Sequence, residues 1–286
     1  MTYFLLGICA FTVSVQNILK QKFNKRCDGG TYLFSAMVSL FAMIVFLVTG
    51  KEWFYSAKLL LPSAGFAISY AVATGAAMLA IYYGSLAKTS LIISCSLLLP
   101  SFYGILFLDE SVSITLIIGI ILLVVSLVMV NYEKDASDKK VSIKWIIFVT
   151  LAFIGNGMCS IVQKAKTQYF GKDGDNLFMI VALAMVVVIL VVMALLSKSE
   201  RPIMGKVVRC GWWLALLCGV ANGLTNFFVI YLNNRNFPAS VMFPVISGGS
   251  VVIVFLYSLI FNKEKFSVRQ IIGFAVGVAS IVLLNL

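Results

Sequence analysis

Apolar residues run along nearly the whole chain in long blocks, and charged residues fall between the blocks. The charges delimit ten charge-free stretches of at least 17 residues, which are 1–19, 29–50, 59–87, 89–108, 111–132, 145–163, 176–197, 210–234, 236–262 and 270–286. About 20 mostly apolar residues at roughly 1.5 Å rise cross a hydrocarbon core of about 30 Å, so each stretch can span a membrane once. The stretches lack the alternating polarity of a membrane barrel, whereas helices satisfy their own backbone hydrogen bonds in lipid. The pattern therefore predicts an all-α membrane protein with ten transmembrane helices.

The longest loop divides these ten spans into five and five. We predict a first five-helix repeat over residues 1–132, a charged linker loop over 133–144 and a second five-helix repeat over 145–286. Because five is odd, the second repeat enters the membrane from the opposite side, which gives the inverted repeats of many secondary transporters.

Weak internal similarity supports the repeat. Sliding one half over the other by 144 residues pairs Lys20 with Lys164, and a shift of 154 near the end of each half pairs Glu110 with Glu264. The change of offset requires insertions totalling ten residues between the matched blocks.

Composition excludes a soluble domain. Hydrophobic residues make up 61% and charged residues 12% of the chain, and the mean hydropathy is +1.03. The formal net charge of +11 would indicate a nucleic-acid partner in a soluble protein, but here the basic residues flank apolar spans. We therefore expect a lipid bilayer as the environment and no nucleic acid as a partner.

The distribution of basic residues predicts orientation. Loops after odd-numbered spans hold 16 Lys and Arg residues and loops after even-numbered spans hold 6. By the positive-inside rule the odd-numbered loops are cytoplasmic and both termini lie outside. The expected location is the plasma (cytoplasmic) membrane, as a multi-pass protein.

The six cysteines form no CxxC pair and most lie in apolar spans, and histidine is absent. We interpret the cysteines as packing residues and expect neither disulfides nor a bound metal.

Two similar segments carry a family resemblance. They are FLDESVSITLIIG (Phe107–Gly119) and FNKEKFSVRQIIG (Phe261–Gly273), and the fourth and ninth spans begin with Lys88-Thr89-Ser90 and Pro238-Ala239-Ser240. With these features the chain resembles the ten-helix EamA-like branch of the drug/metabolite transporter superfamily. The resemblance implies a central substrate cavity between two four-helix groups, with the fifth and tenth spans peripheral. It also implies cytoplasmic termini for many relatives, which conflicts with the charge count.

Related small multidrug resistance proteins carry a buried Glu in their first helix. Residues 1–19 of this chain contain no acid, so the resemblance does not extend to that proton-coupled mechanism.

Polar residues inside the spans are the candidate site, because they are costly in lipid and face a bundle interior or a wet cavity. Thr12, Gln16 and Lys20 recur at four-residue spacing in the first span, and Asn156, Ser160 and Lys164 do so in the sixth. Such stripes either line a cavity or form hydrogen bonds between helices. We expect the two lysines to snorkel to the interface.

Other spans contribute further candidates. Asn222 and Asn226 share a face of the eighth span, Tyr70 and Thr74 share a face of the third, and Ser247 follows Pro244 in the ninth. Tyr82 and Tyr231 match between the halves at an offset of 149, although each also suits an interfacial belt. The predicted substrate-binding residues are Gln16, Tyr70, Thr74, Tyr82, Asn156, Ser160, Asn222, Asn226, Tyr231 and Ser247.

These features favour a secondary transporter that moves small organic metabolites by alternating access. The neutral polar and aromatic candidates suit amino acids, amines or other neutral or zwitterionic solutes. No P-loop, GxSxG or HExxH motif occurs, so we expect neither an enzyme nor a cofactor. A lipid or lipid-linked-sugar flippase and a non-transporting scaffold subunit are the alternatives, and the fifth and tenth spans are candidate surfaces for a homodimer.

Overall fold

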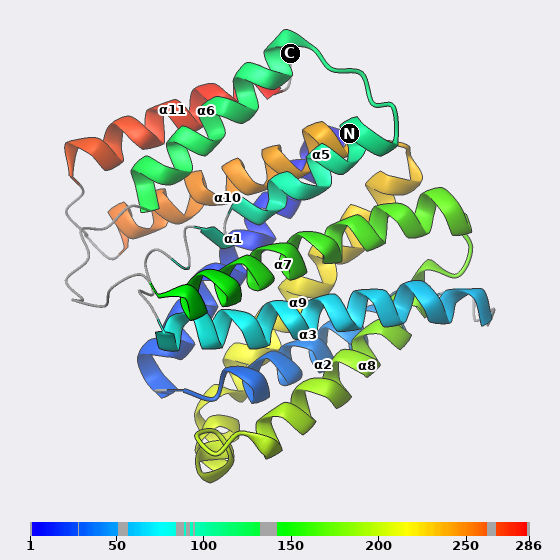
Figure 1. Ribbon diagram of the computed structural model, residues 1–286, viewed down its shortest axis with the longest axis vertical. Helices are drawn as coiled ribbons and strands as arrows, with labels where there is room; N and C mark the ends of the chain where they lie inside the picture. Colours follow the sequence, from blue (N-terminus) through cyan, green and yellow to red (C-terminus); the bar gives the residue numbers. More distant parts are fainter. Residues whose placement is uncertain are drawn as a thin grey trace.

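The computed structural model describes residues 2–27, 29–50, 57–83, 89, 92–93, 95–131, 142–261 and 267–284 (Figure 1). Its ten α-helices are α1 (Thr2–Cys27), α2 (Thr31–Thr49), α3 (Leu60–Tyr83), α5 (Leu98–Phe107), α6 (Ile114–Asn131), α7 (Ile143–Phe170), α8 (Asp175–Leu196), α9 (Met204–Asn234), α10 (Ala239–Ile260) and α11 (Val268–Leu284). Most of the predicted linker 133–144, together with Lys88, Ser90 and Glu264, lies outside the described residues. The described part contains no β-strand.

Seven helical segments are long and apolar enough to cross a membrane, and three shorter apolar helices, Cys95–Phe107, Ile114–Val130 and Val268–Leu284, accompany them within the described residues. The chain is therefore a multi-pass helical membrane protein. The three shorter helices fall in the fourth, fifth and tenth predicted spans.

The helices define two ends of the bundle. The ends of α1 and α8 and the start of α7 lie at one end, together with most of the lysines and arginines that the structure describes (Figure 1). We call this the basic end. The start of α1 and the end of α11 lie at the other, which we call the terminal end.

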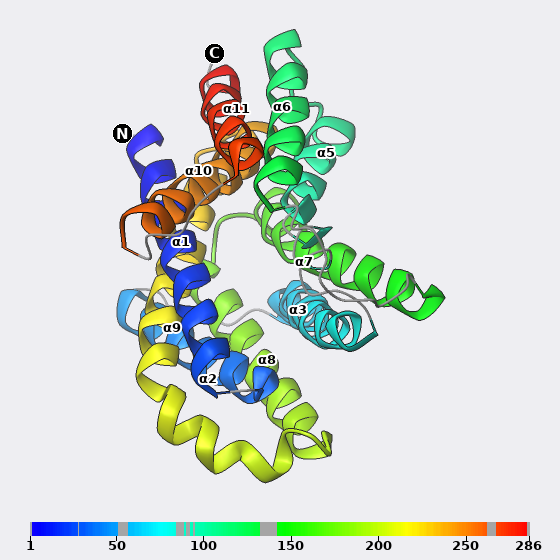
Figure 2. The same ribbon diagram turned by 90° about the vertical axis from the view of Figure 1, so that its left-hand side faces the viewer.

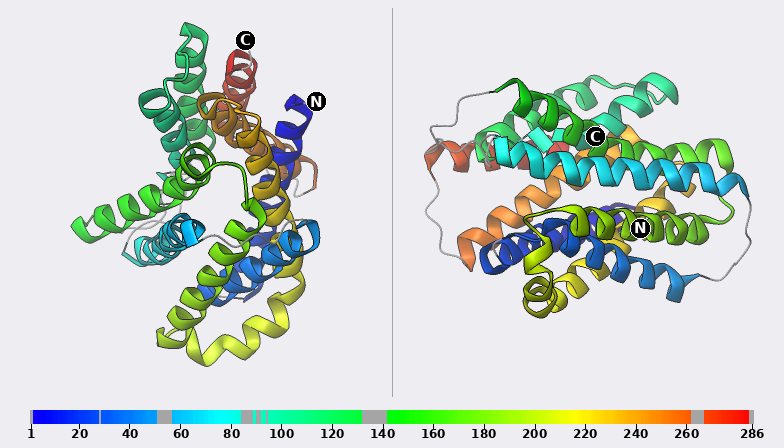
Figure 3. Two further views of the ribbon diagram at one scale, coloured as in Figure 1. Left: turned by 90° about the vertical axis from the view of Figure 1, so that its right-hand side faces the viewer. Right: turned by 60° about the horizontal axis from the view of Figure 1, so that its bottom comes forward.

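Helix α1 has two main neighbours. It lies against α9 and α10, while α2 packs on α8 and α9, and α3 packs on α7 and α8 (Figures 2 and 3). Helices α6 and α11 pack along each other at the periphery, as the resemblance implies for the fifth and tenth spans. This arrangement leaves α1, α3, α7, α9 and α10 facing the interior.

Small residues permit the close helix contacts. A Cβ atom at Gly273 would lie 2.6 Å from the Cβ of Met129, and one at Gly277 would lie 2.5 Å from Ser126 Oγ. The Gly273–Gly277 pair is therefore occupied by α6 of the same chain. Gly219 of α9 meets α2 in the same way.

One expectation about the cysteines is wrong. Cys27, at the end of α1, forms a disulfide with Cys210 in the second turn of α9. The 183 residues between them in sequence give no indication of this proximity, which arises only when α1 packs along α9. Cys9 and Cys218 are free and buried, as packing residues should be.

Candidate functional site: a polar central cavity

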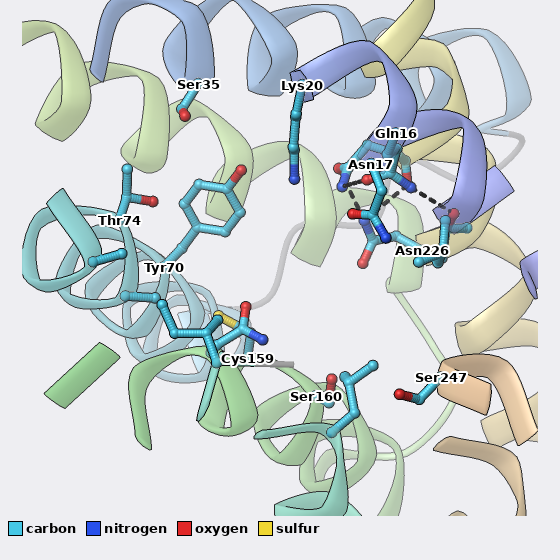
Figure 4. Close-up of a pocket in the computed structure, with 18 of the residues that line it drawn as sticks. Gln16, Asn17, Lys20, Ser35, Tyr70, Thr74, Cys159, Ser160, Asn226 and Ser247 are labelled. Atoms are coloured by element: carbon cyan, nitrogen blue, oxygen red, sulfur yellow. Dashed lines mark hydrogen bonds between the residues drawn. The ribbon is translucent and has the colours of Figure 1, made fainter. Parts of the chain in front are cut away.

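A cavity of about 460 Å³ lies among α1, α2, α3, α7, α9 and α10 (Figure 4). Its polar lining residues are Gln16, Asn17, Lys20, Thr31, Ser35, Tyr70, Thr74, Asn156, Cys159, Ser160, Gln163, Asn222, Thr225, Asn226, Ser247 and Ser250. Both halves of the chain contribute. A volume of this size accommodates a small organic solute.

Eight of the ten predicted site residues line this cavity, and Tyr82 and Tyr231 do not. Tyr82 lies in the last turn of α3 and is 72% exposed. The hydroxyl of Tyr231 accepts a hydrogen bond from Arg235 Nη2 at 2.8 Å, and the guanidinium lies 5.1 Å from the ring centroid. Both tyrosines lie near helix ends, which agrees with the interfacial interpretation rather than with a place in the cavity.

Side-chain amides form a continuous chain of hydrogen bonds across one wall (Figure 4). Gln163 Nε2 donates to Asn226 Oδ1 (2.5 Å), and Asn226 Nδ2 donates to Asn222 Oδ1 (3.1 Å). Asn222 Nδ2 donates to Gln16 Oε1 (2.9 Å), and Gln16 Nε2 donates to Thr225 Oγ1 (2.9 Å). This amide network connects α7, α9 and α1. The two interpretations of the polar stripes are therefore compatible, because the same residues bridge helices and line the cavity.

The amide network includes residues that the stripes did not predict. On α1 the cavity is lined by positions 13, 16, 17 and 20, and on α7 by positions 156, 159, 160 and 163. Both sets follow the i, i+3, i+4, i+7 pattern of a helix face. A strict four-residue spacing instead turns about 40° further around the helix at each step. That drift explains why Thr12 and Lys164 do not line the cavity and why Asn17 and Gln163 were missed.

Thr12 is buried against a neighbouring helix. Its hydroxyl lies 2.7 Å from Thr225 Oγ1 and 3.0 Å from the carbonyl oxygens of Ile8 and Cys9. Thr12 thus packs between α1 and α9, behind the residues that line the cavity.

Asn156 Nδ2 donates to Ser96 Oγ at 2.6 Å, which connects α7 to the segment before α5. Ser247 precedes Gly248 and Gly249 in α10, and this helix continues through Pro244 from Ala239 to Ile260. A Cβ atom at Gly249 would lie 2.9 Å from the Cβ of Ala10, so this glycine admits α1.

The remaining wall is aromatic and hydroxyl-bearing. The rings of Phe66 and Tyr70 on α3 lie with centroids 6.3 Å apart, and both line the cavity with Ser35 and Thr74. Aromatic faces and hydroxyls together suit a solute with both apolar and hydrogen-bonding surfaces.

Ion pairs fasten the terminal end of the bundle. Glu110 accepts hydrogen bonds from the backbone N–H groups of Ala239 and Ser240, each at 2.8 Å, at the start of α10. Lys164 Nζ lies 3.5 Å from Glu110 Oε1 and donates to the carbonyl of Phe237 at 2.8 Å. The side chain of Lys164 is only 7% exposed, so the prediction that it snorkels is wrong.

A second pair joins α7, α8 and α9 at the same end. Lys166 contacts Asp175, and Asn234 Nδ2 donates to the other carboxylate oxygen of Asp175 at 2.5 Å. These contacts close the bundle beyond Gln163, on the side of the cavity away from Lys20.

Lys20 does not follow the snorkelling prediction either, because it lines the cavity and its side chain extends toward the interior (Figure 4). It is the one charged residue among the described lining residues. Within the described part of the chain, no group of three or more His, Cys, Asp or Glu side chains could hold a metal ion.

A multi-pass helical protein with a polar cavity lined from both halves belongs to the class of membrane transporters. More specifically, the chain belongs to the family described as "Sugar transport protein", whose profile matches residues 8–285. This match identifies a family of membrane transporters over nearly the whole chain.

A solved structure described only as "Crystal structure of protein" superposes with a TM-score of 0.78 over 99% of this chain and 97% of the other, at 14% identity. This likeness concerns the fold alone. No curated protein matches the sequence.

Proposed function

We propose that this protein is a secondary transporter that carries a sugar through the central cavity by alternating access, without chemical change of the solute. The observation that carries the proposal is the single cavity that polar residues of α1, α3, α7, α9 and α10 line together. A sugar presents many hydroxyls, each a donor and an acceptor, and the amides and hydroxyls of the lining offer both functions. Phe66 and Tyr70 supply a surface for the apolar faces of a sugar ring.

The family description favours a sugar over the amino acids and amines that the sequence suggested. The lining of the cavity also disfavours amines as the solute. An amine needs a compensating anion in a membrane interior, and no acidic residue occurs among the described lining residues.

We further propose that the ten helices are ten spans in two inverted repeats, residues 1–132 and 145–286. Helix packing supports this, because exchanging the halves relates the pair α3 and α7 to the pair α9 and α1, and relates α6 to α11. Lining positions on α1 and α7 correspond at an offset of 143, one residue from the sequence offset of 144. The contacts of Glu110 and Lys164 close the bundle at its terminal end. Closure at one end of the bundle is expected for one of the two states of an alternating-access transporter.

The alternatives find less support. A scaffold has no need of a large polar cavity lined by both halves. A lipid flippase needs a polar path open to the bilayer, whereas a further hollow of the described surface, between α1, α10 and α11, is lined almost entirely by apolar residues such as Leu6, Val245 and Ile253.

Uptake into proteoliposomes tests the proposal. The purified protein is reconstituted and given radiolabelled neutral and acidic monosaccharides, amino acids and amines in turn, with protein-free liposomes as the control. We expect saturable uptake of at least one sugar, which an excess of the same unlabelled sugar abolishes. Saturable uptake of amino acids without any sugar would overturn the sugar assignment, and no saturable uptake at all would overturn the transporter.

A further inference from the structure

Lys20 occupies an unusual place for a lysine in a membrane helix. It lies on the cavity face of α1, one turn beyond Gln16 and Asn17, and its ammonium extends toward the interior beside Tyr70 (Figure 4). A lysine in a span normally reaches the headgroups or pairs with an acid, since an uncompensated charge there is costly. Within the part of the chain that the structure describes, no acid pairs with Lys20.

Lys20 is exposed, whereas the two buried lysines of the described bundle, Lys164 and Lys166, are compensated. Lys164, the residue that matches Lys20 at the offset of 144, binds Glu110 and the carbonyl of Phe237. Lys166 binds Asp175. Lys20 and Lys164 are therefore the same residue type at matched positions, but among the described residues only Lys164 has an acidic partner.

Nearby charged groups at the basic end are already engaged. Glu200 is 1% exposed, and its carboxylate accepts hydrogen bonds from the backbone N–H groups of Tyr32 and Leu33 at the start of α2. Lys22, two residues after Lys20, lies 5.6 Å from the ring centroid of Tyr257, outside the cavity lining. Among the residues that the structure describes, Lys20 is thus left to interact with what enters the cavity.

The exposed ammonium of Lys20, on the wall of a partly apolar cavity, attracts an anion and repels a cation. One ammonium compensates one negative charge, which matches a carboxylate, whereas a phosphate monoester carries about −1.5 to −2 charges at pH 7 and is usually held by more than one cation. The rest of the lining consists of uncharged donors and acceptors. These amides and hydroxyls suit the hydroxyls of the same molecule.

We propose that the physiological solute is a sugar acid, an aldonic or uronic acid whose carboxylate pairs with the ammonium of Lys20. This inference rests on the proposed sugar transport and narrows its substrate class. Lys20 then determines specificity, by favouring the acid over the neutral sugar with the same ring or chain.

Binding of matched sugar pairs to the purified full-length protein tests the inference. The probes are glucuronate and glucose, galacturonate and galactose, and gluconate and sorbitol, and the readout is the ratio of dissociation constants within each pair. In the wild type we expect the acid to bind about ten-fold more tightly than its neutral partner, because a charge-assisted hydrogen bond in a water-accessible cavity contributes near the lower end of its usual range.

Lys20→Gln should reduce that ratio about ten-fold, and Lys20→Arg should retain a preference for the acid. Lys22→Gln is the matched control, since it removes the same charge from the same end of α1, and it should leave the ratio unchanged. Size-exclusion chromatography of each variant confirms that the protein is folded.

Each outcome decides the question. If a neutral sugar binds as well as its acid, or if Lys22→Gln changes the ratio as much as Lys20→Gln does, the role of Lys20 is overturned while sugar transport stands. If no member of any pair binds, the inference and the proposed function are overturned together.

Discussion

At the scale of single residues, the amide network combines two functions in the same side chains. Asn226 accepts from Gln163 on α7 and donates to Asn222 on its own helix, and all three residues also line the cavity. Hydrogen bonds between membrane helices contribute about 0.6 to 2 kcal/mol each. A network of several such bonds fixes the orientation of the polar groups before a solute arrives.

Asn226→Leu tests this double role. Leucine is close to asparagine in size but cannot form hydrogen bonds, so the amides of Gln163 and Asn222 each lose a partner. The apparent affinity for the transported sugar is taken from the concentration dependence of transport per folded molecule. We expect this affinity to fall about five-fold to a hundred-fold, which corresponds to roughly 1 to 3 kcal/mol.

The control for Asn226→Leu is Ser280→Ala. The Ser280 hydroxyl donates to the carbonyl of Gly119 between α11 and α6, far from the lining. This variant should lower thermal stability and leave sugar affinity unchanged. An unchanged affinity in Asn226→Leu with reduced stability would assign the network to packing alone.

Much of the cavity lining follows from residue type. The cost of an amide or hydroxyl in lipid was enough to select Gln16, Asn156, Ser160, Asn222 and Asn226, all of which line the cavity. Which neighbouring position completes the face was not predictable, because that depends on the rotation of each helix against its partners. Gln163 was missed for this reason, and the partners of Lys164 could not be foreseen because Glu110 and Phe237 come from other elements.

At the scale of helices, close approach rather than hydrophobicity determines which helices are neighbours. Gly219 and Gly223 on α9 face α2, where a Cβ atom at Gly219 would lie 2.6 Å from the carbonyl oxygen of Val38. Gly155 on α7 meets the backbone of α3 in the same way, 2.8 Å from the nitrogen of Ala73. These contacts position α9 and α7 on opposite sides of the cavity.

Gly219→Ala should therefore lower stability, because the new methyl group meets backbone that cannot move aside without separating α9 from α2. We expect a loss of about 1 to 3 kcal/mol, measured as a lower temperature of thermal unfolding in detergent. Gly7→Ala is the matched control, since a Cβ atom at Gly7 has no neighbour within 4 Å. Equal effects of the two substitutions would show that the contact is looser than the structure indicates.

Helix positions were predictable from charge-free stretches, but helix ends were not. The first stretch ends at residue 19, whereas α1 continues to Cys27 through Lys20, Lys22 and Lys25. Lysine and arginine are good helix formers, so a helix extends past the limit of its apolar segment. Pro100 is compatible with α5 because it falls in the first turn, where its missing N–H has no partner within the helix.

At the scale of the whole molecule, the two ends of the bundle differ in charge and in chemistry. The basic end holds most of the Lys and Arg residues that the structure describes, and also the Cys27–Cys210 pair. The positive-inside rule places this end in the cytoplasm, whereas disulfides persist mainly in oxidising compartments. The charge distribution sets orientation during insertion. The two adjacent thiols can form their disulfide wherever conditions are oxidising.

We therefore expect Cys27 and Cys210 to be reduced in living cells and to form a disulfide when membranes are exposed to oxidant. Cells quenched with acid, denatured and then treated with maleimide should give protein labelled at both residues without a reductant. Cys27→Ser and Cys210→Ser identify the labelled sites. A pair that is labelled only after reduction would place the basic end outside.

If the solute passes through the cavity, it should protect a cysteine placed there from chemical modification. In a Cys159→Ser background, Ser160→Cys places a thiol on the lining, and Ser199→Cys places one in the loop before α9, outside the lining. We predict that a sugar transported by the protein slows modification of residue 160 by a water-soluble thiol reagent at least several-fold and leaves residue 199 unaffected, while a sugar that is not transported changes neither rate. Equal rates at residue 160 with and without the transported sugar would show that the sugar does not bind in this cavity.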